Sequence, residues 1–176
     1  NNTVGSDNIY MGDFSGLYNI NGSCNIFIGP NAGYYNTTGS CNLFVGYQSG
    51  FSNTTGTQNS FFGHYSGCAT TTGTFNTFVG YASGARNTSS SNNTYLGAFS
   101  AYCSTMTSNN TILGFCAGFK NTTGTQNTAI GTQALKSNTA SYNTSVGYNS
   151  LYSNTTGYSN SAFGNMSLNG NTTGNN

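Results

Sequence analysis

The feature that most constrains this chain is a short sequence repeat that recurs along almost its whole length. In each repeat an Asn is followed four positions later by a Gly, and an apolar residue directly precedes that Gly. Successive repeats are offset by 17 in residue number, except for one offset of 16 where a Gly is missing near Ala140. Counted from the Asn as position 1, the repeats begin at Asn8, Asn25, Asn42, Asn59, Asn76, Asn93, Asn110, Asn127, Asn143 and Asn160. Self-similarity at a fixed short period predicts a fold built from stacked, equivalent units.

The composition of one repeat predicts the kind of unit. Positions 2–4 and about 7–10 are short stretches suited to strands, and Gly at position 5 and an Asn-Thr-Thr-Gly group separate them. Gly and Asn favour tight turns, and a pair of helices would need about twice this length. We expect an all-β solenoid, or β-roll, of about ten coils, each with two short strands and two turns. Residues 8–176 would form the coils and 1–7 a partial coil of the same single domain, in a rod on the order of 50 Å long.

Two columns of the repeat exchange bulk along the chain. Position 3 is aromatic in the first six repeats and then becomes Ile112, Ala129, Ser145 and Ala162. Position 9 is Gly or Ala through Gly118 and Leu from Leu135 onward. Since a packed interior has a fixed volume, this exchange indicates that positions 3 and 9 share one space.

The strand at positions 2–4 carries apolar residues on both faces. Position 4 is apolar in every repeat, and successive strand residues point to opposite faces. One column is therefore expected in the core and the other outside, where a partner would cover it. We consider two arrangements: an outward aromatic column at position 3, or position 3 inside and position 4 outside. Either predicts self-association into a homo-oligomer or a filament. The candidate interface of the first arrangement is Tyr10, Phe27, Phe44, Phe61, Phe78 and Tyr95.

Charge and hydropathy exclude several classes of function. The net charge is +1, from three basic and two acidic residues, so the clustered Lys and Arg of a nucleic-acid-binding surface are missing. No apolar run approaches the ~20 residues of a membrane-spanning helix, and we expect no membrane insertion. Asp7 and Asp13 are the only carboxylates and His64 the only imidazole. We therefore predict no enzymatic activity, no cofactor and no metal site.

The five cysteines differ in their repeat positions. Cys24 and Cys41 occupy the same position in adjacent repeats, so their Cα atoms would lie ~5 Å apart, within the range of a disulfide. The other three have no matched neighbour. One of them could bridge to another chain, or all could stay free thiols.

Sequons for N-glycosylation recur at position 12. In a chain so rich in Asn and Thr they could be turn chemistry alone. Glycans along one edge would alternatively hydrate a rod that has few charges to prevent lateral aggregation. The candidate glycosylation sites are Asn36, Asn53, Asn87, Asn121, Asn154 and Asn171 at position 12, with Asn21 and Asn109 elsewhere.

The repeats that begin at Asn127 and Asn143, with Asn-Thr-Ala-Ile-Gly and Asn-Thr-Ser-Val-Gly followed by Ser-Asn-Thr, resemble repeats of tail-fibre and other fibre-like surface proteins. They are more distantly similar to the head repeats of YadA-like trimeric autotransporter adhesins. The resemblance implies a β-roll, homotrimerisation, and an extracellular or surface location. The first seven repeats depart from the pattern, with small residues at position 9 throughout and aromatic residues at position 3 in the first six.

The leading hypothesis for function is a structural subunit or shaft of an extracellular fibre or filament, with a glycan coat as a further element. An alternative is an adhesin or viral tail-fibre segment that binds a surface receptor. A third, motivated by the Thr column at position 13, is an ice-binding solenoid, although an outward Thr-x-Thr strand is absent.

Overall fold

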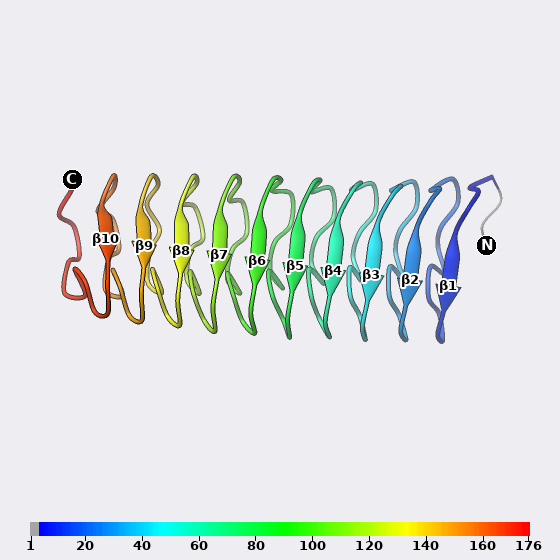
Figure 1. The fold of residues 1–176 in the computed structure, drawn as a ribbon. Coiled ribbons are helices and arrows are strands. Elements are labelled where there is room, and N and C mark those ends of the chain that lie inside the picture. Colours follow the sequence, from blue (N-terminus) through cyan, green and yellow to red (C-terminus); the bar gives the residue numbers. More distant parts are fainter. Residues whose placement is uncertain (1–3) are drawn as a thin grey trace.

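The computed structural model describes residues 4–176 and shows an all-β solenoid. One strand comes from each repeat, and the strands lie side by side along a rod with β1 and β10 at opposite ends (Figure 1). All neighbours pair in parallel in one sheet, in sequence order. The strands are β1 (Ile9–Met11), β2 (Ile26–Ile28), β3 (Leu43–Val45), β4 (Ser60–Phe62), β5 (Thr77–Val79), β6 (Thr94–Leu96), β7 (Thr111–Leu113), β8 (Thr128–Ile130), β9 (Thr144–Val146) and β10 (Ser161–Phe163).

The prediction of two strands per coil was wrong. Positions 7–10 form turns, because positions 7 and 9 both have left-handed backbone angles, as at Asn31 with φ 59° and Gly33 with φ 59°. A strand needs φ near −120° throughout. The segment still pairs with its neighbours, since the Gly33 N–H donates to the Ser49 carbonyl at 3.0 Å. Each coil is thus one strand and a series of turns, hydrogen-bonded to the next coil around its circumference.

The repeat spacing sets the register of the sheet. Ile26 pairs with Leu43 and Phe27 with Phe44, so each residue lies beside its equivalent in the next repeat. The repeat that lacks a Gly keeps the stack, because Thr128 still pairs with its equivalent Thr144. The missing residue falls in a turn, where the Asn127 side chain donates to the Ala140 carbonyl at 2.9 Å.

The expected partial coil at the start of the chain is only partly covered, because residues 1–3 lie outside the described ones. The described remainder does stack on the first coil. The Val4 N–H donates to the Ile20 carbonyl at 3.1 Å, and the Cys24 N–H to the Ser6 carbonyl at 2.9 Å.

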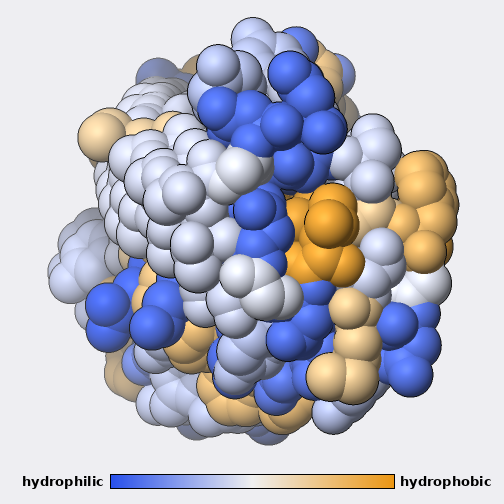
Figure 2. Space-filling view, turned by 90° about the vertical axis from the view of Figure 1, so that its left-hand side faces the viewer, coloured by the Kyte–Doolittle hydropathy of each residue, from blue (hydrophilic) through white to orange (hydrophobic). Residues whose placement is uncertain are grey.

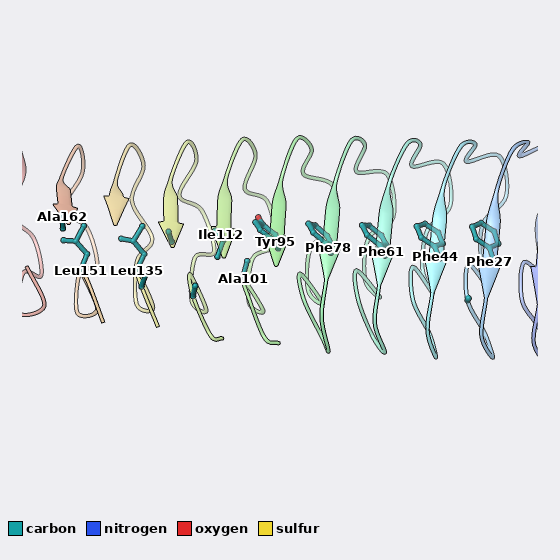
Figure 3. Close-up of a cluster of buried hydrophobic side chains, with 14 residues drawn as sticks. Phe27, Phe44, Phe61, Phe78, Tyr95, Ala101, Ile112, Leu135, Leu151 and Ala162 are labelled. Carbon is teal, nitrogen blue, oxygen red and sulfur yellow. The ribbon is translucent and has the colours of Figure 1, made fainter. Parts of the chain in front are cut away.

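Position 3 lies inside the solenoid, which corrects the candidate interface. The strands bury their middle residue, and Phe27 and Phe44 are fully buried. The rings stack down the axis with centroids 4.9 Å apart for Phe27–Phe44 and 4.8 Å for Phe61–Phe78 (Figure 3). The proposed outward column is therefore the core: Phe27, Phe44, Phe61, Phe78 and Tyr95 are fully buried, and Tyr10 packs against them partly buried. The inward side of the narrow coil has room for one large side chain per level.

Positions 3 and 9 do share one space, as the exchange of bulk predicted. In coils with an aromatic residue at position 3, the residue at position 9 faces the ring, and at Gly33 an added Cβ would lie 2.5 Å from the Phe27 ring. Where position 3 is Ala129 or Ser145, Leu135 and Leu151 fill the core from the other side and are buried (Figure 3). Leu135 adopts φ 51°, a conformation that costs an L-residue roughly 1–2 kcal/mol.

The core reaches the C-terminal end of the rod. Figure 2 views this end and shows hydrophobic side chains near the middle of the end face, surrounded by more polar ones. Leu168, the last position-9 residue, is 47% exposed, whereas Leu151 one coil earlier is fully buried. Each core layer is thus covered by the coil that follows it.

Candidate functional site

The first candidate for a functional site is a metal-binding cluster. Within residues 4–176 no group of three or more His, Cys, Asp and Glu side chains is placed to hold a metal ion. His64 is exposed at position 6. Asp7 accepts a hydrogen bond from the Ser6 hydroxyl at 3.0 Å. In the same part of the chain no helix is long and apolar enough to cross a membrane.

Two columns of Asn side chains line the interior of the turns. At position 1, the Asn42 side-chain oxygen accepts from the Asn59 N–H at 3.0 Å, and its amide donates to the Gly56 carbonyl at 2.8 Å. At position 12, the Asn36 amide donates to Asn19 Oδ1 at 2.7 Å and to the Gly39 carbonyl at 2.9 Å. These ladders satisfy backbone groups that the turns would otherwise leave unpaired.

The ladder at position 12 overturns the predicted line of glycans. N-glycosylation modifies the side-chain nitrogen, and that nitrogen is turned inward. In Asn36, as in Asn53, it donates to two acceptors. A glycan there is incompatible with the folded coil. Asn171 follows the same bonding pattern half-buried at the end of the rod. The buried members of the column are Asn36, Asn53, Asn87, Asn121 and Asn154.

The two candidate glycosylation sites outside that column differ from it. Asn21 and Asn109 have exposed side chains. Asn109 directly precedes Asn110, an inward-facing Asn of position 1. Asn21 lies in the turn that leads to Asn25, the position-1 Asn of its neighbouring repeat. Modification of these two stays a prediction.

Cys24 and Cys41 lie on adjacent coils, as expected from the repeat. Both are exposed free thiols with left-handed backbone angles, φ 57° and 59°. Desolvation, and then the neighbouring Cys41 thiol and Asp7, raise the pKa of Cys24. The disulfide between them stays a prediction. Cys68, Cys103 and Cys116 are half-buried free thiols on other columns.

The Thr column at position 13 is engaged in the solenoid. The Thr37 hydroxyl donates to the Thr54 carbonyl at 3.0 Å, and the Thr54 hydroxyl to the Thr71 carbonyl at 3.1 Å. The same bond recurs along the rod, including Thr88 to Thr105 at 3.0 Å. Hydroxyls that are bound to the next coil do not form a free, flat array. The Thr column therefore gives less support to the ice-binding hypothesis.

The outer face of the sheet is the first candidate for a binding surface. Position 4 points outward on every strand: Phe62 is 47% exposed and Leu96 45%. Position 2, on the same face, is Ile or Leu in β1 to β3 and Ser or Thr from β4 to β10. The position-4 column, called the sheet column below, is Met11, Ile28, Val45, Phe62, Val79, Leu96, Leu113, Ile130, Val146 and Phe163.

The flank formed by positions 6, 7, 10 and 11 is the second candidate. Aromatic rings there contact each other from coil to coil, with Tyr34 stacked on Phe51 at 5.1 Å and Tyr102 on Phe119 at 5.4 Å. A hollow of about 300 Å³ interrupts them. It is lined by Tyr65, Cys68, Tyr81, Ala82, Ala85, Phe99 and Tyr102.

The repeat analysis did not predict this hollow, although its signal is present in the sequence. In the coil that begins at Asn76, positions 7 and 10 are both Ala (Ala82 and Ala85), whereas the next coil has Phe99 and Tyr102 there. This loss of bulk at positions 7 and 10 is visible in the sequence, in the same way as the exchange between positions 3 and 9.

No protein-family model, curated protein or solved structure matches the chain. The likeness to fibre repeats therefore stays a prediction.

Proposed function

We propose that this chain is a shaft segment of an extracellular fibre, and that copies pack side by side through the sheet column. The observation that carries the proposal is the outward apolar position on every strand, from β1 to β10. Scattered exposed apolar residues are ordinary in proteins, but a contiguous row is typical of an interaction surface.

The internal bonding of the rod suits a load-bearing role. Each coil is joined to the next by strand pairing, by backbone bonds at the turns, and by Asn and Thr side chains. In a solenoid each coil contacts only its neighbours, so stability accumulates along the length. These bonds run along the rod axis and would resist extension.

The dimensions of the sheet favour association of like rods. Ten strands at the ~4.8 Å spacing and three residues per strand give a strip roughly 45 Å long and 10 Å wide. Its ~450 Å² is below the ~800 Å² per partner of an ordinary stable interface. Flanking exposed rings such as Phe115 and Tyr148 at position 6 would widen it. A second copy offers a strip with the same length and repeat.

Sedimentation of the purified chain at micromolar concentration tests this proposal. We expect oligomers, and filaments or bundles in electron micrographs. The triple variant Val45→Thr, Phe62→Thr, Val79→Thr keeps residues that suit a strand and should be monomeric with an unchanged circular dichroism spectrum. Thr77→Ser with Thr94→Ser, on the same face at position 2, is the matched control and should still associate. A wild-type chain that is a monodisperse monomer at high micromolar concentration would refute the proposal.

A further inference from the structure

The hollow on the aromatic flank lies where the outward columns lose their large side chains. At position 10, Phe51 and Tyr102 are separated by two coils that carry Cys68 and Ala85. At position 7 the intervening residue is Ala82, between Tyr65 and Phe99. Two vacant levels of a stack with ~4.8 Å spacing leave room for one or two six-membered rings.

The walls of the hollow are held in place by one another. Tyr65 contacts Tyr81 edge to face at 6.0 Å, and Tyr81 contacts Phe99 at 5.2 Å. Phe99 in turn contacts Tyr102 at 5.8 Å. Rings fixed by such contacts lose little freedom when a ligand stacks on them, which favours binding.

The floor and rim of the hollow contain polar groups. The Cys68 thiol donates to the Ala85 carbonyl at 3.3 Å. Tyr65, Cys68 and Tyr81 all line the hollow, and desolvation, followed by the neighbouring groups of Tyr47, Tyr81 and Cys68, raises the pKa of Tyr65. An apolar hollow with a few convergent polar groups is the usual form of a small-molecule site.

The charge beside the hollow is positive. The Arg86 guanidinium lies over the ring of Tyr102, a residue that lines the hollow, 5.4 Å from the ring centroid. Lys120 is exposed at the same repeat position two coils further on. All three basic residues of the chain, Arg86, Lys120 and Lys136, lie at positions 10 or 11, whereas both carboxylates are at the N-terminal end, Asp7 before the first coil and Asp13 within it. A cationic ligand is therefore disfavoured, and a second copy of this chain has few carboxylates to offer.

We infer that this hollow binds a saccharide that carries a carboxylate, such as a hexuronic acid unit of an acidic polysaccharide. The flat C–H face of the sugar would stack on the Phe99 ring. Its hydroxyls would meet the Tyr65 and Tyr81 hydroxyls, and its carboxylate would pair with Arg86. Lys120 would contact a further acidic unit along the rod. This activity goes beyond a structural shaft, since no residue of the sheet column lines the hollow.

Calorimetric titration with galacturonate oligomers tests the inference, with neutral galactose oligomers of equal length as the comparison. We expect binding of the acidic oligomer that weakens as salt is added. Arg86→Gln should weaken it about tenfold and remove the preference over the neutral oligomer. Ala85→Tyr places a ring in the vacant level and should abolish binding. Leu17→Tyr places the same ring at position 10 next to Tyr34, far from the hollow, and should bind like the wild type.

Several results would overturn the inference. They are the absence of binding by the wild type, equal affinity for acidic and neutral oligomers, and unchanged binding by Ala85→Tyr. Each variant is first compared with the wild type by circular dichroism and sedimentation. These measurements distinguish a loss of saccharide binding at the hollow from a loss of the self-association proposed above.

Discussion

The Cβ that a side chain would add at Gly33 lies 2.5 Å from Cε2 of the Phe27 ring. The same relation holds in the next coils, where a Cβ added at Gly50 would clash with the Phe44 ring and one added at Gly67 with the Phe61 ring. Where the ring is absent, as at Ala129, a Leu takes the Gly position. Positions 3 and 9 therefore act as one packing unit, and their substitutions should be coupled.

This coupling can be measured at Phe61 and Gly67. Phe61→Ala should cost roughly 3–5 kcal/mol because it leaves a cavity. Gly67→Leu should cost roughly 1–3 kcal/mol because it forces the Leu against the ring. The double variant reproduces the Ala129 and Leu135 pair and should be less destabilised than the sum by more than about 1 kcal/mol. Urea unfolding followed by circular dichroism gives the three values. Additive costs would show that the two positions do not share a space.

The Gly at position 5 allows steric contact between coils to be separated from backbone strain. Gly80 and Gly164 have similar backbone angles, φ 128° and 118°. A Cβ at Gly80 would lie 2.6 Å from the Gly97 carbonyl carbon, whereas nothing lies within 4 Å at Gly164. Gly164→Ala should lower the free energy of unfolding only by the backbone strain of an Ala at this angle, roughly 1–3 kcal/mol. Gly80→Ala should cost about 2 kcal/mol more. Equal unfolding midpoints would show that stacking does not require Gly here.

Tyr95 should make the solenoid sensitive to alkali. It is fully buried, with its hydroxyl 3.1 Å from both Ser104 Oγ and Thr107 Oγ1. Burial raises its pKa, and hydrogen bonds to Ser104, Thr107 and Asn110 oppose that shift. The unfolded chain releases this proton near pH ~10, so the folded state retains more protons above that pH. Stability is thus fully present below pH ~10 and falls as the pH rises through the folded-state pKa.

Thermal melts between neutral and strongly alkaline pH test this expectation. Tyr95→Phe keeps the ring, should cost about 1 kcal/mol at neutral pH, and should lose less stability on going to alkaline pH than the wild type. Tyr10, whose pKa burial raises to about 12, remains in the variant and contributes the residual loss. An identical alkaline loss in both proteins would exclude Tyr95 as a contributor.

Mild oxidation should join Cys24 to Cys41. Their equivalent places on adjacent coils put them within reach of one another. Because the pKa of Cys24 is raised, its thiolate and hence the oxidation should require a more alkaline pH than an ordinary thiol. The bond closes a short loop and should stabilise the N-terminal coils by up to about 3 kcal/mol. Peptide mapping without reductant identifies the pairing, with Cys41→Ser as the control. Linkage to Cys68 or between chains would contradict this geometry.

The sequence by itself determined the period, the all-β stacked architecture, and the shared space of positions 3 and 9. These follow from local and repeated features: turn residues at fixed places, one residue per level in a parallel stack, and a constant core volume. A change in one column is matched in the other, as from Phe78 and Gly84 to Ala129 and Leu135. These three properties can be inferred without knowing which side chains point into the core.

Only the tertiary structure decided which side of each segment faces the core. Positions 3 and 4 are both apolar, so hydropathy could not choose between them, and Phe44 proved to be inside while Val45 is outside. Likewise Asn36 could have been an exposed sequon or a buried ladder residue, and its direction depends on the turn around it. The left-handed angles at positions 7, 9 and 17 set these directions. A residue such as Gln58 has no local preference for such an angle. Its N–H donates to the Ser40 carbonyl of the preceding coil at 3.1 Å, a contact that no single repeat contains.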